Sequence, residues 1–288
     1  MEKFNYKKTH TNAIMEQVPE VLEWLKSKSP VVHASRYFKY RDYIDDFYKE
    51  NTSISILDEK FKKLNWAFQE LCEIVQVYNS FKDENSDNFN ERIKKIISGQ
   101  DLTPSSLESK SDTSRDFLYE LLVASQFKSI GFHIDFNDQA DVVATKNGDT
   151  IFIECKRLKS KTSLEKNFKK AGKQLALREQ KNAYGLIFID IASCILDKVE
   201  VYEYRNIYDM KQAVNKAISQ YIKDNQKIIT SLNDRFLNDS LGVCMSFFRC
   251  LWLRDLQINY YKDFKVQTSQ HISDELFNKL KGLLDIQA

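Results

Sequence analysis

The dipeptide Asn147-Gly148, set between two apolar runs, is the feature that most constrains how this chain can fold. Both residues tolerate the positive φ of a type I′ turn, which joins two antiparallel strands through a two-residue loop. With these two residues as the loop, Lys146 pairs with Asp149. We therefore expect residues 140–157 to form a β-hairpin in a single register.

That register places two carboxylates face to face. Asp141 lies directly opposite Glu154, and Lys156 shares their face because side chains along a strand alternate with a period of two. Like charges at opposed positions destabilise a sheet, so the arrangement indicates a cation between them. A turn shifted by one residue, to Gly148-Asp149, would instead pair Asp141 with Lys156 in a cross-strand salt bridge on a surface hairpin.

Residues 1–100 have the apolar spacing of helices, and we expect an all-helical N-terminal region. The expected helices cover residues 12–28, 35–50, 57–81 and 88–98. The polar stretch 99–112, which contains Pro104, predicts a linker. The chain therefore divides into an N-terminal region, residues 1–100, and a second domain, residues 101–288.

The second domain alternates helices and strands. In order, we expect a helix over 112–131, a short strand over 132–136, the hairpin over 140–157, a basic helix over 163–182, a buried strand over 184–192, a helix over 208–230 and a strand over 241–253. The order α-β-β-β-α-β, with further elements after it, predicts an α/β fold.

Composition is that of an ordinary globular protein, with 42% apolar and 29% charged residues. The N-terminus has no apolar segment of a secretion signal, and the longest apolar run, residues 241–253, is too short to span a bilayer. The five cysteines form no CxxC pair, which favours reduced core thiols and a cytoplasmic location. Nucleotide-binding motifs of the GxxxxGK[ST] and GxGxxG types are absent from the sequence.

A triplet of an acid, any residue and Lys occurs six times in the chain, so the triplet alone carries little information. Only Glu154 ends an apolar strand with a second acid opposite it. Upstream, Glu120 lies on a largely apolar surface of the helix expected over 112–131, where a charge needs a partner or a cation. The alternatives for Glu120 are an exposed position or an ion pair with Arg115 or Lys128.

The acids and the lysine of this part resemble the motif of the PD-(D/E)XK nuclease superfamily: Glu120, Asp141, Glu154, Cys155 and Lys156. The resemblance covers about residues 112–192, and the spacing D-x(12)-E-x-K is typical of that superfamily. Ala140 stands where the motif name has Pro. The resemblance implies a restriction-endonuclease-like core, a central mixed sheet flanked by helices, which here follows the helical N-terminal region.

The resemblance also implies phosphodiester hydrolysis with Mg²⁺, for which Mn²⁺ is a possible substitute. Asp141, Glu154 and the backbone carbonyl of Cys155 would be metal ligands, which suits a hard ion that prefers oxygen. Glu120 would bind a second metal or a metal-bound water at the edge of the site. Lys156 would orient the attacking water or stabilise the developing charge.

Gln174, on the basic helix, loosely matches a glutamine found in many members of the superfamily. The tyrosine that follows four residues later in the exonuclease-type branch is replaced here by Arg178. Cys155 itself has an alternative role, which is packing on the opposite face of the strand.

A basic segment follows the motif. Residues 153–181 carry 10 basic and 3 acidic side chains, whereas residues 101–152 carry 4 and 9. We interpret the basic side chains as phosphate contacts, which supply affinity without sequence information. They are Arg157, Lys159, Lys161, Lys166, Lys169, Lys170 and Lys173. The alternative is a solvated helix face.

The resemblance thus implies a metal-dependent nuclease, which we expect to be cytoplasmic and to act on DNA in preference to RNA, in restriction, phage defence or repair. The pathway rests on family analogy alone. The alternatives are an RNA-cleaving nuclease of the same fold and a non-catalytic nucleic-acid-binding or scaffold protein. The N-terminal helical region would serve to form a homodimer, dock a partner protein or grip the duplex.

Overall fold

A computed structural model describes residues 14–29, 35–50, 59–101, 112–136, 140–177, 183–199, 204–236, 240–253, 258–268 and 278. The helices predicted for the N-terminal region are present as α2 (Val18–Lys28), α3 (Arg36–Glu50), α4 (Glu59–Phe81) and α5 (Asp87–Ile97). Helix α2 begins later than expected, with Pro19 in its first turn, where the missing N–H of proline costs no hydrogen bond. None of the described helices is long and apolar enough to cross a membrane.

The predicted order of the next elements is confirmed. They are α6 (Thr113–Ser129), β1 (His133–Asp135), β2 (Val142–Lys146), β3 (Asp149–Arg157), α7 (Leu164–Ala176) and β4 (Ala183–Asp190). The Asp112 side chain caps α6 by accepting a hydrogen bond from the Arg115 amide, and Gly131 follows the helix with a φ of 88°.

The last part of the fold differs from the expectation. The elements there are α8 (Ala192–Val199), α9 (Ile207–Asp224), α10 (Gln226–Phe236), β5 (Ser240–Trp252) and β6 (Ile258–Gln267). The single helix expected over 208–230 is two helices that divide at Asn225, and α8 was not predicted. Strand β6 was missed because it is an edge strand with charged side chains, so it lacks an apolar pattern.

These strands form one mixed six-stranded sheet in the order β1-β2-β3-β4-β5-β6. Strands β1, β2 and β3 are antiparallel, β3, β4 and β5 are parallel, and β5 and β6 are antiparallel. The chain is therefore an α/β protein, as the sequence predicted.

The hairpin has the predicted register. Asn147 and Gly148 have φ angles of 55° and 84°, and Lys146 lies opposite Asp149. The last pair of the ladder is Val142 with Ile153, so the next positions outward are those of the two acids.

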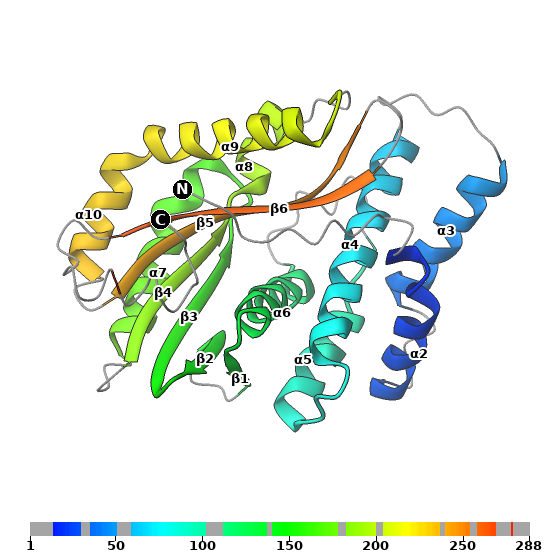
Figure 1. Ribbon diagram of the computed structural model, residues 1–288, viewed down its shortest axis with the longest axis horizontal. Helices are drawn as coiled ribbons and strands as arrows, with labels where there is room; N and C mark the ends of the chain where they lie inside the picture. The colour runs from blue at the N-terminus through cyan, green and yellow to red at the C-terminus, as the bar shows by residue number, and fades with distance from the viewer. Residues whose placement is uncertain are drawn as a thin grey trace.

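Helices cover both faces of the sheet, with α2 to α6 on one side and α7 to α10 on the other (Figure 1). The first group shares an apolar cluster with Ile151, Ile153 and Phe188, and the second packs on Phe152 and Ile187. The N-terminal helices thus share a hydrophobic core with the sheet. The boundary between residues 100 and 101 stays a prediction, and the expected linker lies largely outside the described residues.

A buried ion network joins the N-terminal helices to α6. The Glu70 carboxylate on α4 accepts hydrogen bonds from Arg36 Nε and Arg115 Nε, and Arg115 also pairs with Asp112 at 2.9 Å. Glu70 and both arginines are buried. A buried charge is tolerated only when it is paired, so the three helices are held in one arrangement.

The turn offers a clean test of the register. We expect Gly148→Ala to lower the free energy of unfolding by about 1–2 kcal/mol, because a Cβ is disfavoured at this positive φ. No heavy atom lies within 4 Å of the added Cβ, so the cost comes from the backbone alone. Asn147→Gly is the control and should change stability little. Urea unfolding measures both, and an unchanged Gly148→Ala protein would contradict the turn assignment.

Candidate active site

Asp141 lies where the hairpin ladder ends. Its Oδ2 accepts a hydrogen bond of 2.7 Å from the backbone N–H of Cys155, so the side chain takes the place of the next ladder bond. In an antiparallel pair the N–H and C=O of one residue face the same neighbour. The Cys155 carbonyl is therefore expected to face Asp141, which is the side that its predicted role as a metal ligand requires.

Lys156 supplies the cation between the two acids. Its Nζ lies 3.0 Å from Asp141 Oδ2 and 2.9 Å from Glu154 Oε2. The Glu154 side chain is 0% exposed and that of Lys156 is 12% exposed. The salt bridge to Asp141 thus forms in the unshifted register, without a turn at Gly148-Asp149, because Lys156 reaches across from the next position on the same face.

The charge on Lys156 is held in place by its neighbours. Burial acts to lower its pKa, but Asp141 and Glu154 together raise the pKa above its ordinary value. The ammonium is therefore protonated at neutral pH. Lys156 can donate hydrogen bonds and stabilise negative charge, but it is not poised to act as a general base.

Glu120, on α6, lies beside this group. Its side chain is 13% exposed and accepts a hydrogen bond of 2.8 Å from Arg92 Nη1, so its partner is neither Arg115 nor Lys128. Burial, followed by the charge of Asp141, raises the pKa of Glu120 to about 8, although Arg92 and Lys156 act in the opposite direction. Three acidic side chains are thus crowded at the site, and the raised pKa favours the protonated form of Glu120 at neutral pH.

Arg92, on α5, is a residue of this site that the sequence did not predict. It also donates a hydrogen bond of 2.7 Å to the backbone carbonyl of Asp141. A signal was present: Arg92 lies on the apolar face of its helix, together with Phe89, Ile93 and Ile96. A basic residue on such a face requires a buried partner, but the spacing does not reveal which one.

Cys155 is buried, and burial raises the pKa of its thiol well above the ordinary value. This suits the packing role. Gln174 lies near the end of α7, ten residues beyond its start at Leu164, which corresponds to about 15 Å along the helix. Its buried Oε1 has no hydrogen-bond partner, and no hydrogen bond joins Gln174 to Asp141 or Lys156 among the described contacts.

The predicted phosphate contacts differ in exposure. Lys159, Lys166, Lys170 and Lys173 are exposed, and the last three lie on α7. Lys169 pairs with Glu165 one turn earlier on the same helix. Lys161, also exposed, lies 3.0 Å from Asp197.

The position of Arg157 differs from the prediction that this residue is a surface phosphate contact. Its side chain is 16% exposed and lies 3.6 Å from both Asp190 Oδ2 and Asp116 Oδ1. The alternation of side chains along β3 turns Arg157 away from the face that carries Lys156. It therefore does not join the exposed lysines as a surface phosphate contact.

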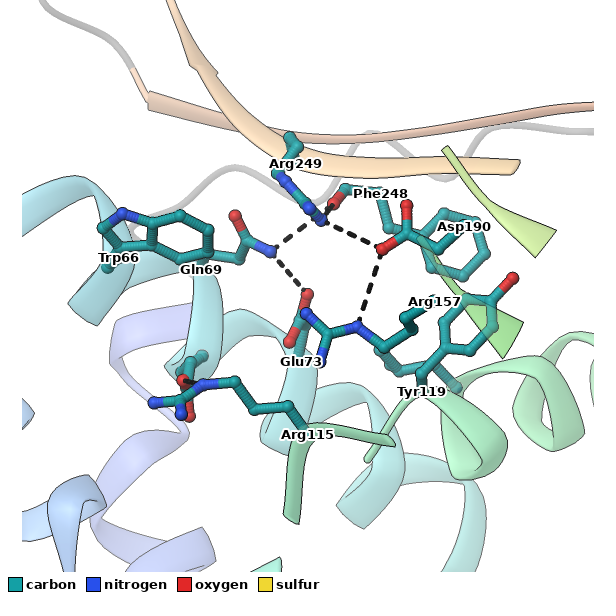
Figure 2. A pocket seen from close by; sticks show the side chains of 11 residues that line it. Trp66, Gln69, Glu73, Arg115, Tyr119, Arg157, Asp190, Phe248 and Arg249 are labelled. Atoms are coloured by element: carbon teal, nitrogen blue, oxygen red, sulfur yellow. Dashed lines mark hydrogen bonds and ion pairs between the residues drawn. The ribbon is translucent and has the colours of Figure 1, made fainter. Parts of the chain in front are cut away.

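Arg157 instead lines a small polar cavity of about 20 Å³ between α4, α6 and the sheet (Figure 2). Asp190 lies between Arg157 and Arg249, whose Nη1 is 3.5 Å from Asp190 Oδ2. On the helix side, Gln69 donates a hydrogen bond of 2.9 Å to Glu73. Burial, and then Glu70, raise the pKa of Glu73 to about 7. Sequence spacing gave no signal for this cavity.

The carboxylates of Glu120, Asp141 and Glu154 are the hard oxygen donors that suit Mg²⁺. Within the described residues, no group of three or more His, Cys, Asp or Glu stands ready to hold a metal ion. Lys156 and Arg92 pair with these carboxylates instead. The donor chemistry fits Mg²⁺. Binding of the ion would require the Lys156 ammonium to move out from between the carboxylates of Asp141 and Glu154.

The position of Lys156 predicts that removing its charge lowers the stability of the protein. Lys156→Met leaves buried Glu154 and Asp141 opposed without a cation, which should destabilise the metal-free protein by about 3–5 kcal/mol. An Mg²⁺ ion held by the two carboxylates would restore part of that stability, because it would bind only the folded protein. Unfolding in urea with EDTA or Mg²⁺ measures both effects. Lys166→Met, at an exposed position of α7, is the control, and equal stability of the two variants would contradict the pairing.

Comparisons with known proteins give no family to which the chain can be assigned: no protein-family model, no curated protein and no solved structure matches it.

Proposed function

We propose that this protein is a Mg²⁺-dependent nuclease of the PD-(D/E)XK type. The observation that carries the proposal is the meeting of Asp141, Glu154 and Lys156 at the end of the hairpin, with the lysine ammonium 2.9–3.0 Å from both carboxylates. A third acid, Glu120, lies close enough to Asp141 for the two charges to affect each other. Acidic side chains this close together do not stabilise a sheet, so their proximity favours a functional site.

The order of elements supports a restriction-endonuclease-like core. A helix, three antiparallel strands, a second helix and a parallel strand follow one another as α6, β1, β2, β3, α7 and β4. Glu120 lies on α6, Asp141 directly precedes β2, and Glu154 and Lys156 lie on β3, an order that agrees with the superfamily motif.

In this proposal each residue has a role. Asp141, Glu154 and the Cys155 carbonyl would hold the ion, and Glu120 would hold a metal-bound water or a second ion at the edge. Bound Mg²⁺ supplies charge neutralisation of the scissile phosphate and a lowered pKa of a bound water. Lys156 would donate hydrogen bonds to the oxygens that gain negative charge as the phosphodiester bond breaks.

The exposed lysines of α7 give the proposed enzyme a surface for the phosphate backbone. We propose DNA as the substrate in preference to RNA, and a cytoplasmic role in restriction, phage defence or repair. An RNA-cleaving enzyme of the same fold would use the same residues. The N-terminal helices are proposed to offer a surface for a second copy or a partner protein.

One observation favours a different candidate, a non-catalytic nucleic-acid-binding protein. Lys156 already pairs with both Asp141 and Glu154, so the three residues form a salt-bridged structural group without a metal. The two candidates differ in whether nucleic acid is cut when Mg²⁺ is added.

Cleavage assays decide between them. We expect the wild type to cut plasmid DNA, linear single-stranded DNA or structured RNA with Mg²⁺ and not with EDTA. Glu154→Gln and Lys156→Ala should abolish cleavage and keep nucleic-acid binding, because these groups handle the metal and the developing charge. A wild type that binds but cuts none of the three substrates, with Mg²⁺ or Mn²⁺, would favour the non-catalytic candidate.

The α7 surface makes a separate prediction. Changing Lys166, Lys170 and Lys173 to Glu should weaken binding to all sequences alike and reduce the slope of log K against log salt by ~1 for each lost contact. Binding titrations at several salt concentrations measure the slope. Lys227→Glu, an exposed change on α10, is the control. An unchanged slope in the α7 variants would make that helix a solvated face.

A further inference from the structure

A single arginine from the N-terminal region reaches the two parts of the candidate site. Arg92 Nη1 lies 2.8 Å from Glu120 Oε2 and 2.7 Å from the backbone oxygen of Asp141. Glu120 belongs to α6, whereas Asp141 lies at the start of the hairpin. The same nitrogen therefore ties a helix to a strand end across the site.

The environment of Arg92 fixes its guanidinium. The side chain is 7% exposed, and its guanidinium carbon lies 6.0 Å from the centre of the Phe136 ring. The neighbouring basic residues of α5, Lys94 and Lys95, belong to the exposed face of the helix. A buried guanidinium has few alternative positions, because each would leave its N–H groups without partners.

The bond to the Asp141 carbonyl has a consequence for the Asp141 side chain. Asp141 lies outside the ladder of β2 and β3, so no backbone pair of the ladder holds it in place. Its carboxylate must nevertheless reach the Cys155 amide and Lys156 Nζ. The hydrogen bond from Arg92 holds the main chain at the point from which that reach is possible.

We propose that Arg92 is a positioning residue of the site, which sets the main chain at Asp141 and the carboxylate of Glu120. The helices of residues 1–100 then build the site as well as cover the sheet. The effect on cleavage rests on the proposed nuclease function, whereas the effect on Asp141 does not.

The positioning itself can be tested without metal. Hydrogen–deuterium exchange in EDTA, read by mass spectrometry with residue-level fragmentation, reports the Cys155 amide, which is held by Asp141 Oδ2. We expect Arg92→Met to speed exchange at Cys155 about 10-fold or more and to leave the amides of α4 unchanged. Lys94→Met, on the exposed face of α5, is the matched control and should match the wild type. Unchanged exchange at Cys155, or faster exchange throughout α4 as well, would overturn the proposal.

Arg92→Lys keeps the positive charge, and it is the variant to measure if Arg92→Met does not fold. An ammonium lacks the planar fork of a guanidinium, so we expect an exchange rate at Cys155 between those of the wild type and Arg92→Met. If Arg92→Met does not fold, a wild-type rate at Cys155 in Arg92→Lys would overturn the proposal.

Cleavage kinetics complete the test. Residues that orient metal ligands contribute roughly 10- to 100-fold to activity, so kcat should fall by that factor in Arg92→Met while KM for nucleic acid stays unchanged. A wild-type kcat in this variant would overturn the catalytic part. A wild type that cuts nothing would refute the proposed function, and the exchange measurement would still decide whether Arg92 positions Asp141.

Discussion

The positive φ angles at Asn147 and Gly148 are the constraint on which the candidate site depends. They fix a two-residue loop, and the loop fixes the pairing of every residue along β2 and β3. A slip of one residue would turn each side chain of β2 to the opposite face, away from Lys156. The geometry in which one ammonium contacts two carboxylates therefore follows from a turn at the far end of the hairpin.

Paired charges hold buried carboxylates at two places in the part of the chain that the structure describes. Lys156 forms salt bridges with Asp141 and Glu154 at the hairpin, and two arginines form salt bridges with Glu70 between α3, α4 and α6. Because a buried acid without a partner is costly, each such group holds the elements around it in a single arrangement. The N-terminal helices contribute to these groups, so they share both the apolar core and the polar interactions of the sheet domain.

Helix α6 has two polar faces with different neighbours. Glu120 faces Arg92 and the candidate site, whereas Arg115 and Tyr119 line the cavity of Figure 2, and Asp116 pairs with Arg157 of the same cavity. Strand β3 repeats this division, since Lys156 and its neighbour Arg157 lie on opposite faces. The candidate site and the buried cavity are thus separate groups of side chains. Adjacent residues of the same strand belong to the two groups, so a substitution in one group lies close to the other.

The sequence by itself determined the features that depend on neighbours a few residues apart. These are the helices of the N-terminal region, the caps of α6, the order of elements through β4, and the register that opposes Asp141 and Glu154. Tertiary structure alone decided which distant groups meet: Arg92 with Glu120, and Arg157 with Asp190. It also decided the short helix α8, the edge strand β6 and the place of Gln174 near the end of α7. The physical reason is range: turn dihedrals and side-chain periodicity act locally, whereas a buried charge selects its partner from residues that only packing brings within 3–4 Å.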